Sequence, residues 1–179
     1  GTACSSGALR RQLSEPQRGA SRSHLACLLR AWVKTLRSER VDEGDPDGLV
    51  RRWGLDDRTA AAVVALEQEA RCALAPCGLR WPGVYVISGF RSSPVEAELS
   101  RDSPLARRSL HMATRAGRPA SLAVDLRVGG QPASTTPIEL WTWLGQIWKR
   151  VTPGGRWGGD FTSPDVNHFD LGLRADVNI

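Results

Sequence analysis

The hydrophobic periodicity changes once along the chain, and this change limits the possible folds more than any other feature. Apolar residues recur at helical spacing as far as residue 74, whereas short strand-like segments alternate with helical ones from residue 84 onward. One amphipathic helix is predicted from Ser23, and a second from about Asp57 to Leu74. The acidic segment 41–48 between them contains glycine and proline and is predicted to be a loop.

The second half of the chain predicts short strands separated by capped helices. Ser93 and Thr136 are each predicted to be the N-cap of a helix, with the following proline, Pro94 or Pro137, as its first helical residue and a glutamate two positions later. Helices followed by short strands with helical insertions indicate an α+β fold. The strand candidates are residues 84–87, the alternating segment 122–128, the residues around Trp157, and residues 167–171.

The length of the chain, 179 residues, suits one domain with a sizeable core. Residues 1–22 are polar, basic and aperiodic, and we expect them to form a flexible arm. Residues 23–179 then form a single domain whose N-terminal helices lead into the strand-containing part. Hydrophobic residues make up 41% of the chain and charged residues 24%, which are values of a globular protein rather than a disordered one.

The net charge of +5 and the pI of about 9.6 favour anionic surroundings such as nucleic acid, anionic lipid or cell-wall polymers. The basic residues are mostly scattered arginines, whereas a nucleic-acid binder clusters them on one element with aromatic residues. We therefore expect no nucleic-acid partner. The sequence has no apolar run of 18 residues, so no membrane span is expected, and its first residues show no secretion signal.

Four cysteines, Cys4, Cys27, Cys72 and Cys77, form an even set that could make two disulfides in an oxidising compartment. Cys72 and Cys77 are separated by four residues, close enough for a local bridge. A cysteine metal site is disfavoured because no second pair lies nearby. Burial as free thiols is the alternative, and the sequence leaves the redox state open.

Two histidines and one aspartate are the residues best suited to metal chemistry. Asp125 is the one acid in strand 122–128, His111 lies in the segment before it, and His168 lies in the last predicted strand. Each alone has an ordinary explanation as an exposed or locally hydrogen-bonded side chain. Together, two imidazoles and a carboxylate supply the three protein ligands of a catalytic zinc that keeps water in its fourth position. Asp165 would then be placed to take a proton from that water.

Several short motifs occur in the order of a known family. They are SGFRSS at 88–93, SLH at 109–111, AVDL at 123–126, WGGDF at 157–161 and DVNHFD at 165–170. In this order they resemble the zinc D-Ala-D-Ala carboxypeptidase and L-alanyl-D-glutamate peptidase family, which has the Hedgehog/DD-peptidase fold. The resemblance covers about residues 85–172. It implies a small antiparallel sheet that carries a zinc site and is preceded by N-terminal helices.

The resemblance also implies a role for each matched residue. His111, Asp125 and His168 would bind Zn²⁺. Asp165 would be the base that activates water, and Arg91 would hold the substrate and stabilise the developing oxyanion.

The chain departs from the family pattern between the first two ligands. Thirteen residues separate His111 from Asp125, which is longer than the usual spacing. The additional stretch contains glycine and proline, and we expect it to loop out without moving the ligands. Arg115 and Arg118 within it could meet substrate carboxylates or be solvated.

The substrate is also implied by the resemblance. Members of this family with an aspartate base preceded by a WGGD motif resemble endopeptidases. These cut between L-Ala and D-Glu of the peptidoglycan stem peptide, as phage endolysins do. The alternatives are a D-Ala-D-Ala carboxypeptidase and a non-catalytic zinc-containing binding module. We expect a monomer that acts at the cell wall, in the periplasm or outside the cell. Trp157 and Asp160 are expected to be structural, and Ser109 to have a supporting role.

Overall fold

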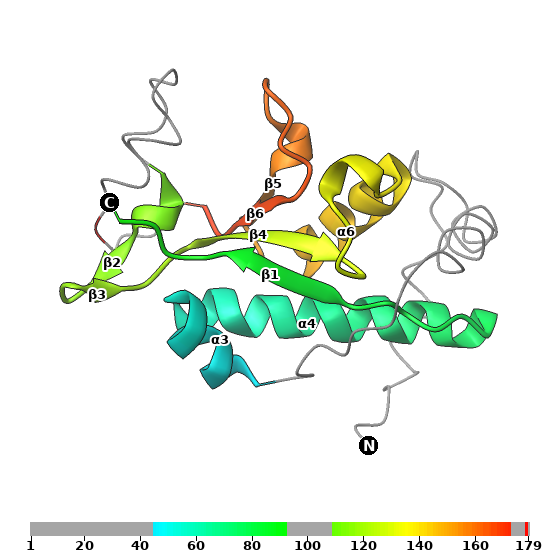
Figure 1. Cartoon of the computed structure of the whole chain (residues 1–179), viewed down its shortest axis with the longest axis horizontal. Helices are drawn as coiled ribbons and strands as arrows, with labels where there is room; N and C mark the ends of the chain where they lie inside the picture. Colours follow the sequence, from blue (N-terminus) through cyan, green and yellow to red (C-terminus); the bar gives the residue numbers. More distant parts are fainter. Residues whose placement is uncertain (1–44, 93–108, 173–177, 179) are drawn as a thin grey trace.

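The computed structural model describes residues 45–92, 109–172 and 178 (Figure 1). The predicted arm at 1–22, the helix predicted from Ser23 and the helix start predicted at Ser93 lie outside these residues. Within them the chain combines helices with a small antiparallel sheet, which confirms the α+β prediction.

The described part of the chain contains three α-helices: α3 (Pro46–Trp53), α4 (Asp57–Leu74) and α6 (Ile138–Val151). The loop prediction for residues 41–48 is wrong from Pro46 onward, because that proline begins α3. A proline fits the first turn of a helix, where its missing N–H has no partner to lose. The helix ends at Gly54, whose φ of 61° is readily adopted by glycine. Short 3₁₀ turns are formed by Ala75–Cys77, Leu110–Met112, Ala133–Thr135 and Gly158–Asp160.

The start of α6 differs from the prediction by one residue. Pro137 is the N-cap rather than the first helical residue, and Thr136 makes no capping hydrogen bond. The hydroxyl of Thr136 instead donates to the carbonyl oxygen of Pro132, 3.2 Å away, across the preceding 3₁₀ turn.

The main sheet has four antiparallel strands in the order β1-β4-β6-β5. Its central strand β4 pairs with β1 on one side and with β6 on the other. A second sheet consists of β2 and β3 alone. The strands are β1 (Val84–Ser88), β2 (Thr114–Arg115), β3 (Arg118–Pro119), β4 (Ala123–Val128), β5 (Arg156–Trp157) and β6 (His168–Asp170).

The long segment between His111 and Asp125 folds as the β2–β3 hairpin. Ala116 and Gly117 form its turn, both with positive φ, as two-residue hairpin turns require. Arg115 extends from the hairpin to the buried carboxylate of Asp56, with Nη2 and Oδ2 2.5 Å apart. Arg115 is therefore committed to a structural ion pair, while Arg118 is exposed.

One hydrophobic core joins the helices to one face of the sheet. Leu122, Val124, Leu126 and Val128 are fully buried, as the alternation of residues 122–128 predicts. Trp141 and Trp148, two turns apart on α6, pack around Phe169 of β6. Trp143 points elsewhere and contacts Trp81. Figure 1 shows the long helix α4 running beside the sheet, and α4 packs against α6.

Two further predictions can be compared with the structure. Cys72 is disulfide-bonded, and the side chains of the other three cysteines lie outside the described residues. No helix in the described part of the chain has both the length and the apolar character needed to cross a membrane.

The contact between α6 and β5 yields a stability prediction. A Cβ added at Gly145 would lie 2.6 Å from Cε3 and 2.8 Å from Cγ of the buried Trp157 ring. We expect Gly145→Ala to lower the free energy of unfolding by about 1–3 kcal/mol, because an overpacked core must shift to make room. Chemical denaturation measures this, with Gln146→Ala on the same helix as the control. Equal or greater stability of Gly145→Ala would contradict the packing described here.

Candidate metal centre

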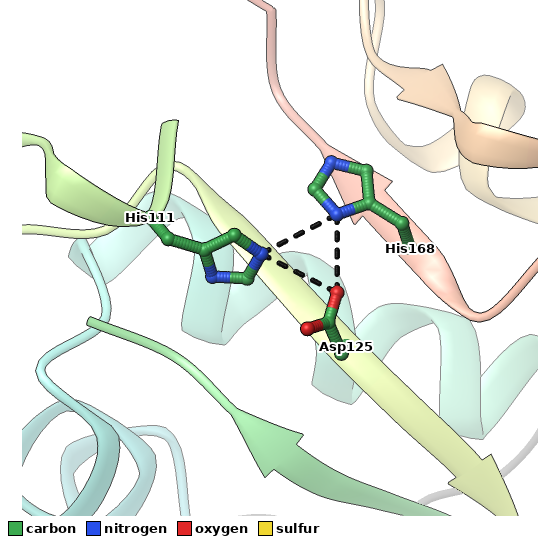
Figure 2. A group of neighbouring side chains, drawn as sticks. All are labelled: His111, Asp125 and His168. Atoms are coloured by element: carbon green, nitrogen blue, oxygen red, sulfur yellow. Dashed lines mark hydrogen bonds and ion pairs between the residues drawn. The ribbon is translucent and has the colours of Figure 1, made fainter. Parts of the chain in front are cut away.

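Three elements bring the predicted metal ligands together. Asp125 lies on the central strand β4 and is the direct cross-strand partner of His168 on β6. His111 lies in the 3₁₀ turn Leu110–Met112, which precedes the hairpin. Asp125 Oδ1 is 3.3 Å from His111 Nε2 and 3.0 Å from His168 Nδ1. The two nitrogens are 3.3 Å apart, so the three atoms form a compact triangle (Figure 2).

The three side chains are largely removed from solvent. His111 is 2% exposed and Asp125 is 7% exposed, while His168 is partly buried. Asp125 lies on the face of β4 opposite the leucines and valines, where the sequence alone left open a solvent-exposed carboxylate. Its burial means that the second face of β4 is also covered at this point.

Each of the three candidate ligands also has a hydrogen-bond or ion-pair partner outside the triangle. His111 Nδ1 is 2.6 Å from the carbonyl oxygen of Gly89, which can only accept, so Nδ1 carries the hydrogen and Nε2 offers its lone pair. His168 Nε2 is 3.4 Å from Asp170 Oδ2. Arg91 pairs with Asp125 Oδ2, leaving Oδ1 directed to the histidines. Such outer partners orient metal ligands and select their tautomers.

The backbone around His111 explains how its outer partner is placed. The Ser109 side chain accepts the backbone N–H of His111 and caps the 3₁₀ turn, which is the supporting role expected for it. Gly89 lies so close to the carbonyl of Trp53 that any Cβ would overlap it, so only glycine brings its own carbonyl to His111. The glycine of the SGFRSS motif is therefore a packing requirement of the site.

Arg91 is positioned by an irregularity in β1. The register of β1 against β4 shifts between Val86 and Ser88, as in a β-bulge. Ser88 then pairs with Asp125, and its hydroxyl accepts a hydrogen bond of 2.8 Å from Arg91 Nε. The sequence predicted that Arg91 would contact substrate; the structure places its guanidinium beside the carboxylate ligand, with 21% of the side chain exposed.

The charged groups of the site shift one another's pKa. Burial alone would raise the pKa of Asp125, but its interactions with the imidazoles of His111 and His168 hold it well below its usual range. Burial opposes protonation of His168, but hydrogen bonds to Asp125 and Asp170 outweigh it and raise its pKa from 6.5 to about 9. In the absence of a bound metal we therefore expect the His168 ring to be protonated on both nitrogens at neutral pH.

Asp165 lies at the edge of the same site. Its N–H donates to the carbonyl of Gly158 over 3.0 Å, and its own carbonyl accepts the N–H of His168 over 3.1 Å. Although the residue as a whole is exposed, partial burial of its carboxyl raises the pKa of Asp165, and the charge of Asp125 raises it further. A Cβ on Gly158 would overlap the Asp165 carbonyl, so the WGG motif permits this close approach.

Trp157 is part of the packed core, whereas Asp160 lies on the surface. Trp157 is buried, and its indole N–H donates to the carbonyl oxygen of Val166 over 2.7 Å. Asp160 forms an ion pair with Lys149 on the surface of α6.

Asp170 and the carbonyl of Gly89 are site components that sequence reasoning missed. Asp170 is fully buried, and its carboxylate also accepts two hydrogen bonds from Arg156, of 2.9 and 3.0 Å. Burial raises the pKa of Asp170, but hydrogen bonds from His168, Arg156 and Gly172 hold it below its usual value. The sequence did contain a signal for Asp170: residues two positions apart on a strand lie on the same face, which places Asp170 beside His168.

The geometry fits a small tetrahedral ion. A zinc ion with bonds of about 2.0–2.1 Å holds its ligand atoms about 3.3–3.4 Å apart. The observed separations are 3.3, 3.0 and 3.3 Å, so little movement is needed to bind. Ca²⁺ takes six to eight oxygen ligands, which this nitrogen-rich set does not supply. The structure thus shows a buried group of side chains that could hold a metal ion.

A search against models of known protein families found no match to the chain, and no match was found among curated proteins.

The raised pKa of His168 predicts how metal binding depends on pH. A metal must displace the proton from His168, so affinity is weakened below the pKa of about 9 and increases as pH rises toward it. We expect the dissociation constant for Zn²⁺ to fall about tenfold per pH unit between pH 7 and 9, with about one proton released per ion. Titration calorimetry in buffers of different ionisation enthalpy measures both. An affinity that stays constant over this range would show that His168 is already neutral.

Proposed function

We propose that the chain is a zinc-dependent hydrolase of the peptidoglycan stem peptide that cuts the bond between L-Ala and D-Glu. The observation that supports this most is a group of three side chains that could hold a metal ion, with a separate carboxylate, Asp165, at its edge. Structural zinc sites use four protein ligands, whereas catalytic sites use three and keep the fourth position for water or substrate. The cluster in the described part of the chain contains three.

The residues around the site suit peptide hydrolysis. His111, Asp125 and His168 would hold the zinc ion, which would lower the pKa of a bound water to about 7 and polarise the scissile carbonyl. Asp165 takes the proton of the attacking water and passes it to the leaving amine. Its raised pKa suits both steps, since an acid–base catalyst works best with a pKa nearer the operating pH. Arg91 contributes positive charge that stabilises the negative charge growing on the carbonyl oxygen.

The choice of zinc rests on the donor set and its spacing. Two imidazoles and one carboxylate whose ligand atoms lie 3.0–3.3 Å apart match a tetrahedral zinc site with one open position. The same donors also suit iron(II), which keeps several open positions for oxygen chemistry. Metal analysis of the purified protein separates the two.

The substrate and location are inferred from the motifs that resemble the stem-peptide hydrolases. An aspartate base preceded by WGGD favours the L-Ala–D-Glu endopeptidases among them. The net charge of +5 suits an anionic cell wall, and the disulfide at Cys72 suits an oxidising compartment outside the cytoplasm. We propose a monomer that acts at the wall, in the periplasm or outside the cell.

Two other functions use the same site. A D-Ala-D-Ala carboxypeptidase would share the ligands and the base and differ in the bond presented to them. A non-catalytic zinc-containing module would need the ligands but not Asp165. The raised pKa of Asp165 beside the ligands favours an enzyme over this module.

Digestion of purified peptidoglycan distinguishes these functions. With the zinc-loaded protein we expect peptides with new N-terminal D-Glu, and no such peptides after treatment with a chelator, as measured by mass spectrometry. Loss of terminal D-Ala alone would make the protein a carboxypeptidase with the same site. No zinc-dependent product would favour the non-catalytic module.

Substitution of Asp165 tests its role as the base. We expect Asp165→Asn to reduce kcat by about 10²–10⁴-fold, because an amide cannot take up the proton, while the protein still binds one zinc ion. Asp160→Asn is the matched control: it lies in the same loop, pairs with Lys149 on the surface and should retain activity. Hydrolysis by Asp165→Asn at the wild-type rate would exclude this base.

A further inference from the structure

Asp170 lies behind the ligand His168, on the side opposite the metal triangle. The two residues are separated by one position on β6, so their side chains project from the same face of the strand. His168 Nδ1 faces Asp125, and His168 Nε2 faces Asp170 Oδ2 at 3.4 Å. The ring therefore spans two carboxylates, one of them a candidate metal ligand and the other outside the ligand set.

The partners of Asp170 determine what the His168 ring presents to it. The carboxylate already accepts from Arg156 Nε and Nη2, and its Oδ1 accepts the N–H of Gly172 over 2.7 Å. Arginine and a backbone N–H can only donate, so Asp170 acts as an acceptor throughout. The ring nitrogen that faces it must carry a hydrogen.

This arrangement fixes both the tautomer and the orientation of His168. With hydrogen on Nε2, the lone pair of the neutral ring is on Nδ1, which is the atom in the triangle. A ring turned by half a revolution would lose the hydrogen bond to Asp170 and move Nδ1 away from Asp125. Asp170 is itself held by the bidentate contact with Arg156, its cross-strand partner on β5.

We propose that Asp170, held by Arg156, is a positioning residue that makes His168 an Nδ1 ligand of the metal. For His111, the corresponding hydrogen-bond partner is the backbone carbonyl of Gly89, which no side-chain substitution can remove. Asp170, by contrast, contacts its histidine through a side chain, so its role can be tested by substitution. This inference rests on the metal site of the proposed function and does not depend on which bond is cut.

The competing explanation is purely structural. Asp170 and Arg156 face each other across β6 and β5, and opposite charges in such a pair stabilise a sheet. In that case, removing the carboxylate would lower stability and leave the metal affinity of the folded protein unchanged. A positioning role lowers the affinity itself.

The test compares two buried aspartates of the full-length protein. Asp170→Asn removes the ionic acceptor behind His168. Asp56→Asn is the matched control, because the Asp56 side chain is also fully buried and paired with arginines but touches no ligand. Zinc affinity is measured by competition with a chromophoric chelator, at a temperature where circular dichroism shows both variants folded. We expect a 10–100-fold loss for Asp170→Asn and less than about threefold for Asp56→Asn.

The outcomes are distinct. An affinity of Asp170→Asn within about threefold of the wild type, or an equal loss in both variants, overturns the proposal. Wild-type protein that binds zinc tightly but cleaves nothing contradicts the proposed function and leaves this inference standing.

A second measurement needs no substitution and applies if Asp170→Asn does not fold. Nitrogen-15 NMR of the cadmium-loaded wild type reports the state of each His168 ring nitrogen. We expect coupling of ¹¹³Cd to Nδ1 and a slowly exchanging hydrogen on Nε2. Coupling to Nε2, or an Nε2 hydrogen that exchanges as fast as that of free imidazole, would overturn the proposal.

Discussion

The buried carboxylate of Asp125 is the constraint around which the rest of the structure is arranged. Its strand is the centre of the sheet, and the alternate residues of β4 are fully buried in the hydrophobic core. Removing a carboxylate from water costs several kcal/mol unless charged or hydrogen-bonded partners replace the solvent. Those partners are His111, His168 and Arg91, each from a different element. The contacts that make burial of Asp125 tolerable are therefore the contacts that assemble the site.

The sequence predicted the parts of this arrangement that depend on local pattern. Alternation placed Leu122 and Val124 on one face of a strand and Asp125 on the other, and the motifs named the three residues that meet. Alternation does not reveal what covers a face, so the burial of Asp125 could not be read from it. The ion pair of Arg115 with Asp56 was missed for a related reason: it joins a hairpin to a helix start distant in sequence.

The hairpin between His111 and Asp125 explains how the thirteen residues that separate them leave the two side chains close together. Backbone hydrogen bonds close it at its base, from Ala120 to the carbonyl of Ala113 and from Leu122 to that of Leu110. These bonds bring the two ends of the hairpin side by side. The residues between the ends therefore add only the entropic cost of closing a loop, which grows slowly with loop length. Ser121 adds to this closure, since its buried hydroxyl lies 3.4 Å from the carbonyl oxygen of Leu110.

The spacing of Asp165 and His168 also has a physical basis. The N–H of His168 donates to the carbonyl of Asp165, and the N–H of Asp165 donates to that of Gly158. These bonds tie the proposed base to the ligand through a single turn and tie both to the end of β5. A displacement of β6 would carry the carboxylate and the imidazole together, so their separation depends on one turn rather than on the packing of the whole sheet. A base on a different element would lose its distance to the metal whenever the two elements shifted.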